Sequence, residues 1–195
     1  MDDIFDKLNQ SLQTGFIDKS IISSSDYQPE LLVNQKNPPK KVLSTLLTEL
    51  EKCNHFYISV AFVTTSGVAA IINKLKELEH REIKGEILVS QYLNFTQPEA
   101  LKRLLQFDNI DLRIATKGNA HTKGYIFKTK KYFNLIVGSS NLTANALSTN
   151  QEWNLKVSAL DESGIVEKVL QEFKSDFKKA TPVNAEFIAA YQEIY

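Results

Sequence analysis

The stretch HTKGYIFKTKKYFNLIVGSSNLTANALSTNQEWNLKV, residues 121–157, decides the fold of this 195-residue chain. Residues 123–129 and 132–139 are short runs rich in aromatic and β-branched side chains, joined tightly through Lys130 and Lys131, which predicts a pair of hairpin strands. A further strand is predicted where apolar residues alternate, at Trp153, Leu155 and Val157. Three consecutive strands are therefore expected within this stretch.

Polar side chains stand where these strands begin or end. His121 and Lys123 are two residues apart at the entry to the first strand, so they project to the same side. Gly138 permits a tight turn at the end of the second strand, and Ser139 and Asn141 follow it. These polar groups are expected to lie beside one another.

Glu152 stands at the start of the third strand, so three strand ends would bring an imidazole, an ammonium, a carboxamide and a carboxylate to one place. That set suits phosphodiester chemistry. A neutral imidazole can attack phosphorus, lysine and asparagine can bind the non-bridging oxygens, and a carboxylate can orient the imidazole through its second nitrogen. Each motif alone is common on protein surfaces, but their order along three strands favours the functional interpretation.

Outside this stretch, strands alternate with amphipathic helices. Strands are predicted at 55–63, 85–90 and 110–114, and helices at 2–13, 40–53, 67–79, 97–107, 142–147, 161–178 and 184–195. This alternation predicts an α/β fold in which helices flank both faces of a mixed, largely parallel sheet.

Composition excludes several classes of protein. The 23 basic and 23 acidic residues give a formal charge of zero, which argues against a histone-like nucleic-acid binder. The only cysteine, Cys53, excludes a disulfide scaffold and a cysteine zinc site. The apolar runs are far shorter than the roughly 20 residues of a membrane helix, and the acidic N-terminus does not resemble a signal peptide. We expect a cytoplasmic protein without a membrane partner.

The sequence also contains no metal-ligand spacing and no phosphate-binding loop of the nucleotide-hydrolase type, so we expect no cofactor. Basic residues concentrate in residues 101–131, which hold eight basic and two acidic side chains, a local charge of +6. We expect this stripe to lie beside the candidate site, where it can position a phosphate backbone without reading bases, although a solvated surface is the simpler interpretation of any single lysine. The lysines that we expect to bind nucleic acid are Lys117, Lys128, Lys130 and Lys131.

The motif set HTK, GSSNLT and NQEWN resembles that of the phospholipase D superfamily, in which His-x-Lys is followed by Gly-Ser-x-Asn and a downstream Glu. Within it, the chain is most similar to the phospholipase-D-like nuclease domain at the N-terminus of some DEAD/DEAH-type helicases. The resemblance spans about residues 30–160, and it is carried by the segments VAFVTTSGV, SQYLNFTQPEAL, HTKGYIF, GSSNLTANAL and NQEWNL.

The resemblance implies a role for each motif residue. His121 would be the nucleophile or the general acid, while Lys123 and Asn141 would bind phosphate. Ser139 and Gly138 would support the loop, and Glu152 would orient the histidine. The chain departs from the full pattern at one position, since an aspartate is expected five residues after the lysine and Lys128 stands there.

The family mechanism uses two such motifs, one histidine attacking and the other protonating the leaving oxygen. This chain has three histidines, and neither His55 nor His80 is followed two residues later by a lysine. A complete site would therefore need two chains about a two-fold axis, the commonest symmetry of oligomers.

The sequence thus predicts a metal-independent phosphodiesterase that cleaves DNA through a phosphohistidine intermediate, completed by homodimerisation and working as part of, or partner to, a helicase. The alternative is a non-catalytic nucleic-acid-binding or dimerisation module of a helicase, and a phospholipase is a weaker third. The expected organisation is an N-terminal segment at 1–39, a phospholipase-D-like catalytic domain at 40–160, and C-terminal helices at 161–195. Those helices would pack on the domain or lead to a helicase domain.

Overall fold

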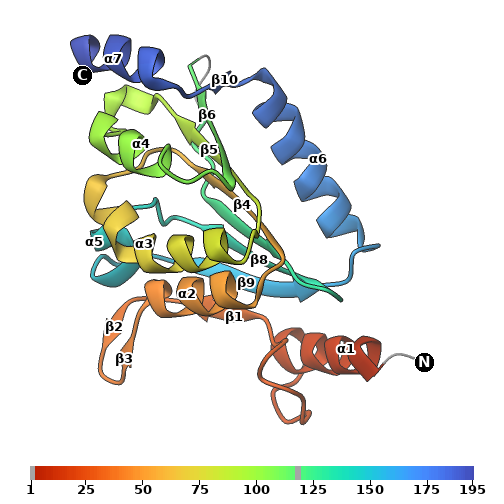
Figure 1. Ribbon diagram of the computed structural model, residues 1–195. Coiled ribbons are helices and arrows are strands. Elements are labelled where there is room, and N and C mark those ends of the chain that lie inside the picture. Colours follow the sequence, from red (N-terminus) through yellow and green to blue (C-terminus); the bar gives the residue numbers. More distant parts are fainter. Residues whose placement is uncertain (1–2, 117–119) are drawn as a thin grey trace.

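The computed structural model describes residues 3–116 and 120–195. Its principal strands are β1 (Glu30–Leu32), β4 (His55–Val60), β5 (Gly85–Ser90), β6 (Ile110–Ala115), β7 (Gly124–Lys128), β8 (Phe133–Gly138), β9 (Asn154–Ala159) and β10 (Thr181–Pro182). Within the described residues they form an eight-stranded sheet in the order β1-β9-β8-β7-β4-β5-β6-β10 (Figure 1). The expected α/β fold with a mixed sheet is confirmed, and the expected parallel pairing is found among β4, β5 and β6, whereas the other five strand pairs of this sheet are antiparallel.

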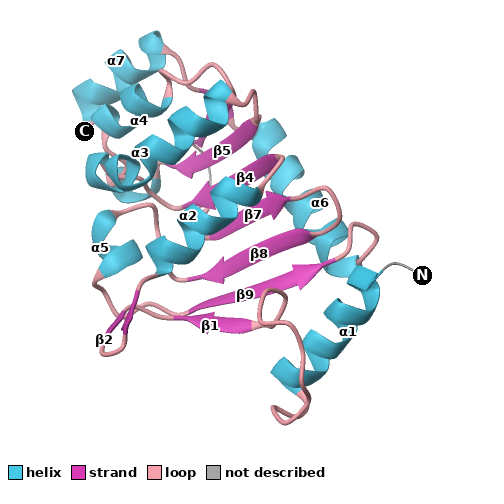
Figure 2. Cartoon of the chain, turned by 60° about the horizontal axis from the view of Figure 1, so that its bottom comes forward, coloured by secondary structure: helices cyan, strands magenta, loops and turns pink. Residues whose placement is uncertain are grey.

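Parallel pairing occupies the part of the sheet built by the alternating half of the chain. β4 pairs in parallel with β5, and β5 with β6. The neighbouring pairs β4–β7, β7–β8, β8–β9, β9–β1 and β6–β10 are antiparallel. As a result, the carboxyl ends of β4, β5, β6 and β8 share one edge with the amino ends of β7 and β9, the left edge of the sheet in Figure 2.

Helices cover both faces of this sheet, as the sequence predicts. One face carries α2 (Val42–Lys52), α3 (Thr65–His80), α4 (Pro98–Leu104), α5 (Ala144–Ser148) and α7 (Ala185–Ile194). The other face carries α6 (Gly164–Lys179), which Figure 1 shows on the side of the sheet away from α2 and α3. The first helix, α1 (Asp3–Phe16), lies beside β9 and the start of α6, where apolar side chains line a shared groove.

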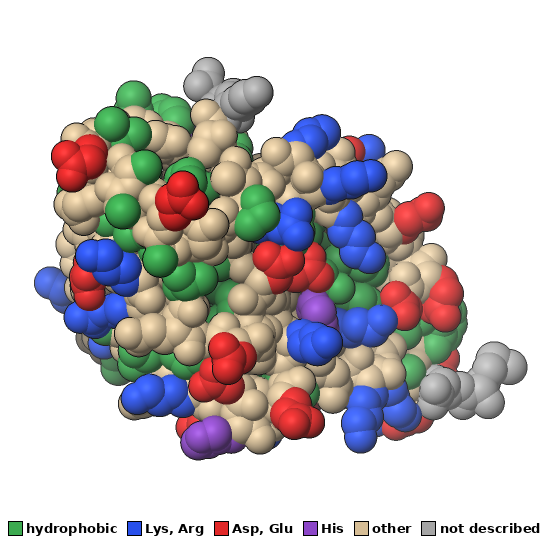
Figure 3. Space-filling view, turned by 45° about the horizontal axis from the view of Figure 1, so that its top comes forward, with side chains coloured by type: hydrophobic (Ala, Val, Ile, Leu, Met, Phe, Trp, Pro, Cys, Tyr) green, Lys and Arg blue, Asp and Glu red, His purple; other side chains and the backbone are tan. Residues whose placement is uncertain are grey.

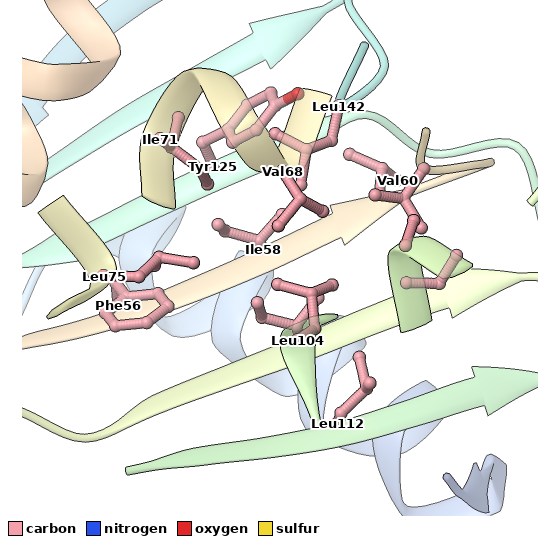
Figure 4. Packing of buried hydrophobic residues seen from close by; sticks show 14 of the residues in the cluster. Phe56, Ile58, Val60, Val68, Ile71, Leu75, Leu104, Leu112, Tyr125 and Leu142 are labelled. Atoms are coloured by element: carbon pink, nitrogen blue, oxygen red, sulfur yellow. The ribbon is translucent and has the colours of Figure 1, made fainter. Parts of the chain in front are cut away.

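Alternation along β4 supplies side chains to both layers. Phe56, Ile58 and Val60 point into the larger apolar cluster beneath α3 and α4, and Tyr57 points into the smaller one beneath α6. Figure 4 shows the larger cluster closing around Ile58, with residues from α3 and β7 above the strand. Burial on both faces explains why β4 reads as a continuous apolar run.

Side-chain caps set the starts of three of the longer helices. Thr64 accepts a hydrogen bond from the backbone N–H of Gly67 at the start of α3, and Ser163 accepts one from Val166 at the start of α6. Asn184 caps α7 in the same way, accepting from the N–H of Phe187. Serine, threonine and asparagine at these positions therefore define helix boundaries.

The outermost strands of the sheet, β1 and β10, are short strands that the sequence analysis did not predict. β1 comes from the N-terminal segment and pairs with β9, while β10 follows α6 and pairs with β6. A separate ribbon joins β2 (Gln35–Lys36) to β3 (Pro39–Lys40). The sheet therefore contains strands from the predicted N-terminal segment, central domain and C-terminal segment. None of the described helices is long and apolar enough to cross a membrane.

A buried polar network ties α2 to the sheet. Glu49 of α2 is 1% exposed, and its carboxylate accepts hydrogen bonds from Lys156 Nζ at 2.8 Å and from the Asn134 side-chain amide. Asn134 in turn accepts from the Ser158 hydroxyl at 2.5 Å. Each buried polar group here has a partner, as burial requires.

Cys53 lies in the apolar core directly after α2. Its side chain is fully buried, and its Sγ–H donates to the Leu50 carbonyl at 3.2 Å. Burial raises the pKa of the thiol to about 12, because the thiolate would lose its hydration. The thiol therefore stays protonated at neutral pH.

Candidate active site

The residues that the motif analysis selected gather at the sheet edge where the carboxyl ends of β4 and β8 meet the amino ends of β7 and β9. Lys123 continues β7 toward this edge, and its carbonyl accepts from the Gly138 N–H at 3.2 Å. Gly138 in turn pairs with Asn154 of β9. The three strand ends therefore lie side by side, as the sequence predicts.

His121 and Lys123 form the centre of the site. The Lys123 ammonium lies 2.7 Å from Nδ1 and 3.0 Å from Nε2 of the His121 ring, and 2.8 Å from the His121 carbonyl oxygen. A neutral imidazole has one acceptor nitrogen, so the tautomer decides which ring contact is the hydrogen bond. The imidazole is exposed, whereas Lys123 is only 8% exposed. The ring can therefore meet a ligand while the cation lies behind it.

Two opposing effects act on the charge of Lys123. Burial lowers its pKa, because the ammonium loses hydration, and the negative charge of Glu152 acts in the opposite direction. Glu152 thus contributes to the electrostatics of the site even though it comes from a different strand end.

The loop after β8 approaches β9 closely. A Cβ on Gly138 would lie 2.2 Å from the Trp153 carbonyl oxygen and 2.6 Å from the Asn154 Cα, so a larger residue would push the strands apart. The Ser139 N–H donates to the Trp153 carbonyl at 3.1 Å, and the Ser139 hydroxyl donates to the Glu152 carboxylate. Glycine is required here because the backbones of two strands pass so closely.

Asn141 joins this loop to the end of β4. Its Oδ1 accepts from the backbone N–H groups of Ala61 at 3.0 Å and Phe62 at 3.2 Å. These two donors fix the orientation of the carboxamide, and among the described residues none accepts from its Nδ2. The NH₂ group therefore remains available to donate to a ligand oxygen.

The carboxylate of Glu152 accepts from Ser139, and within the described residues it makes no hydrogen bond to His121. The aromatic ring of Tyr92 lies against the imidazole instead, with ring centroids 4.8 Å apart and planes at 58°. A role of Glu152 in orienting the histidine therefore stays a prediction.

Two residues that the motif analysis did not select hold the Gly138–Asn141 loop from below. Asn154 accepts from the Ser140 N–H at 3.2 Å and donates to the Ser140 hydroxyl at 2.9 Å. Tyr125 donates its hydroxyl to the Ser140 carbonyl at 2.9 Å. Both side chains are almost fully buried. The only sequence signal for Asn154 is an asparagine within a predicted strand, where its residue type is unusual.

The lysines that we expected beside the site lie elsewhere. Lys128 is five residues along β7 from Lys123, a separation of about 17 Å at the usual rise of a strand. Lys130 and Lys131 belong to the turn beyond it, at the opposite edge of the sheet. Our expectation that these three adjoin His121 is therefore wrong, while a binding role for them stays a prediction, and Lys117 lies outside the described residues.

Lys128 also clarifies the departure from the superfamily motif. Its ammonium lies 3.6 Å from Asp161, near the opposite edge of the sheet from the imidazole. A positive charge at this position therefore does not enter the site. On the face shown in Figure 3, basic and acidic side chains are interspersed rather than separated into areas of one charge.

The remaining histidines lie outside the site. His55 opens β4 and lies 3.3 Å from Glu86 of β5, and His80 is the last residue of α3. Over residues 3–116 and 120–195, no cluster of three or more His, Cys, Asp or Glu side chains could hold a metal ion.

The sheet order, the His-x-Lys pair and the glycine-serine loop together define a phospholipase-D-like domain. A family model described as the phospholipase-D-like domain of cardiolipin synthase matches residues 46–179, and the chain belongs to this family. No sequence among the curated proteins matches the chain.

Solved structures share the fold. NucT from Helicobacter pylori is 20% identical with a TM-score of 0.61, covering 80% of this chain and 99% of its own. Nuc, a phospholipase D family member from Salmonella typhimurium, is 15% identical with a TM-score of 0.64, covering 81% of this chain and 100% of its own. Phosphatidylserine synthase from Haemophilus influenzae is 14% identical with a TM-score of 0.58, covering 80% of this chain and 39% of its own. The shared architecture supports the assignment of the fold class.

Proposed function

We propose that this protein is a metal-independent phosphodiesterase that cleaves DNA through a phosphohistidine intermediate formed on His121. The observation that carries the proposal is the contact between the exposed imidazole and the buried ammonium of Lys123, 2.7 Å and 3.0 Å from the two ring nitrogens. A nucleophilic imidazole and a buried cation therefore lie next to each other at this end of the strands. Membership of the phospholipase-D-like family supports the same reaction class.

In this mechanism, a ring nitrogen of His121 attacks phosphorus and the bond to the leaving oxygen breaks. Lys123 and the NH₂ group of Asn141 stabilise the charge on the non-bridging oxygens. A second imidazole gives its proton to the leaving oxygen and then accepts one from the water that hydrolyses the phosphohistidine. The products are an alcohol and a phosphate monoester, and His121 is regenerated.

The second imidazole is supplied by a second copy of the chain, since each chain has one His-x-Lys motif. An exposed apolar surface next to the site supports self-association. Val137 and Leu155 are directly paired on neighbouring strands and are 52% and 43% exposed, and Trp153 is 72% exposed. This apolar ladder of Val137, Trp153 and Leu155 adjoins Gly138 and Glu152. A two-fold dimer that buries it would bring two sites together.

DNA is proposed as the substrate because the motif segments resemble those of a nuclease domain. The same resemblance is the support for a cytoplasmic role within, or in partnership with, a helicase. The family description names a lipid-synthesising enzyme, so phospholipid is the substrate to test against DNA. Cleavage of phospholipid instead of DNA would contradict the proposed substrate.

The proposal is tested with a small phosphodiester, a DNA oligonucleotide and a phospholipid vesicle as parallel substrates. Wild-type protein should cleave the first two in the presence of EDTA, and His121→Ala should abolish both activities. His80→Ala, which changes an exposed histidine at a helix end, is the matched control and should retain activity. DNA binding without cleavage would favour the non-catalytic module, and cleavage of the vesicle lipid alone would contradict a nuclease.

A further inference from the structure

Aromatic side chains border the candidate site on the side of the parallel strands. Phe62 follows the end of β4 and Phe95 lies in the loop after β5, with ring centroids 5.6 Å apart and planes at 71°. We call Phe62 and Phe95 the aromatic pair. Phe95 is 52% exposed and Phe62 is half-buried. A phenylalanine exposed to this degree contributes little to the core.

The aromatic pair is tied directly to the phosphate-binding side of the site. The Phe62 N–H donates to Oδ1 of Asn141 at 3.2 Å, so the backbone that carries one ring also fixes the carboxamide. The carboxamide that would donate to a ligand oxygen is therefore held by the residue that carries one ring of the pair. The apolar ladder, by contrast, adjoins the site on the side of Gly138 and Glu152.

Phe95 is held in place by its neighbours. Thr96 is fully buried, its hydroxyl donates to the Ser90 carbonyl at 2.8 Å, and its carbonyl accepts from the Tyr191 hydroxyl at 2.9 Å. The Phe95 N–H donates to the Tyr92 carbonyl at 3.1 Å. The chain before it passes through left-handed backbone at Leu93 and Asn94, with φ of 49° and 56°. These contacts fix the backbone on both sides of Phe95, whose ring remains exposed to solvent.

The structure also distinguishes these rings from aromatic residues that serve the core. Tyr125, another aromatic residue close to the motif, is 1% exposed and its hydroxyl supports the Gly138–Asn141 loop. Tyr92 contacts the imidazole of His121. Phe95 is the ring of this group that offers more than half of its surface to solvent.

We propose that the aromatic pair is a stacking platform for one unpaired base, so that the substrate is single-stranded nucleic acid. This inference rests on the proposed function for the position of the phosphate. A base on the strand whose phosphate meets Lys123 and Asn141 would place its face on the exposed ring of Phe95. In a duplex, the neighbouring base pairs cover that face, whereas in a single strand it is free to stack on an aromatic side chain.

The test measures binding in a His121→Ala background, which prevents cleavage. The probes are a fluorescent thymine oligonucleotide, an abasic strand of the same length and a duplex hairpin. Phe95→Ala should weaken binding of the thymine strand roughly thirtyfold, the middle of the range for loss of one stacked base. Binding of the abasic strand and of the hairpin should not change.

Three further variants make the result specific to stacking. Phe95→Trp should retain affinity for the thymine strand, and Phe95→Leu should lose it although it remains apolar. Phe16→Ala removes a ring of α1 that is 59% exposed and is not tied to the site, so it should bind like the parent. Equal affinity of the Phe95→Leu variant and the parent, or an equal loss on the abasic strand, would overturn the platform.

The outcome is separable from that of the proposed function. Cleavage of a small phosphodiester by the wild-type protein, and its loss in His121→Ala, tests the chemistry without any base. If that activity is absent while Phe95→Ala still weakens binding of the thymine strand alone, the platform stands and the catalytic assignment fails. If cleavage is normal and Phe95→Ala has no effect on any strand, the platform fails alone.

Discussion

Lys123 differs from the surface lysines Lys7 and Lys74 in that its pKa is lowered, whereas theirs are raised. Burial lowers its pKa and the charge of Glu152 raises it. The cation is the form that stabilises phosphate oxygens, so activity should be lost as the pH rises through the pKa of this group. The alkaline limit of activity thus depends on Glu152 through electrostatics.

Replacing Glu152 with glutamine should shift the alkaline limb of the kcat/KM profile to lower pH. The substitution removes the negative charge that raises the pKa of Lys123, so the ammonium loses its proton at lower pH. Initial rates across a pH series measure the shift. Glu162→Gln is the control, because Glu162 is exposed and follows the opposite end of β9. An alkaline shift, or the same shift in both variants, would count against this account.

Asn154 should act as a positioning residue for the motif loop. Asn154→Ala leaves the buried N–H of Ser140 without its partner, a cost of about 1–3 kcal/mol. Urea unfolding should show that loss, and kcat should fall more than KM rises because the loop is displaced. Asn145→Ala, at an exposed position of α5, should change neither quantity. Normal kcat in a destabilised Asn154→Ala variant would restrict its role to stability.

The sequence identified the motif residues because their chemistry and order are visible along the chain. The partner of Glu152 was not visible, because Ser139 reaches it through a close approach of two backbones that only Gly138 permits. Asn154 and Tyr125 were missed for a related reason. Both side chains make hydrogen bonds to backbone groups of Ser140. Every residue has these backbone groups, so the sequence gives no sign of which side chain will bond to them.

At the level of elements, a buried ion pair between Glu49 and Lys156 connects α2 to β9. Lys156→Met should destabilise the protein by about 3–5 kcal/mol, because the carboxylate of Glu49 would remain buried without its cation. The double variant Glu49→Leu with Lys156→Met should recover much of this loss. Urea midpoints provide the measurement.

The matched control is Lys168→Met in α6, which removes a solvent-exposed ion pair with Glu172 and should leave the urea midpoint unchanged. If the double variant is no more stable than Lys156→Met, the loss came from packing rather than from the unpaired charge.

The longer elements could be predicted from periodicity, since α3, α6 and the buried strands each carry an apolar pattern over a turn or more. β1 and β10 could not, because strands of three and two residues are too short to show a pattern. These two segments become strands because they pair with β9 and β6, which are distant from them in the sequence. The hairpin turn explains the misplaced lysines, since it sends Lys130 and Lys131 to the opposite edge of the sheet from His121.

At the scale of the whole molecule, the proposed mechanism requires two chains, because each chain carries one His-x-Lys motif. When wild-type protein is mixed and exchanged with an equal amount of His121→Ala, the activity per total protein should fall to about a quarter of the wild-type value, because only dimers of two wild-type chains are complete. Sedimentation should show a dimer, and Leu155→Glu in the apolar ladder should yield an inactive monomer. An activity per total protein of half the wild-type value would indicate that each chain works alone.

The enclosed thiol of Cys53 makes the natural chain a convenient background for spectroscopic labelling. Its pKa of about 12 and its full burial prevent reaction with nitroxide or fluorophore reagents at neutral pH. A cysteine introduced at Asn145 would therefore carry the only label. In a two-fold assembly, the dipolar coupling between two such labels would give the distance between the two α5 helices, in solution and without a crystal lattice.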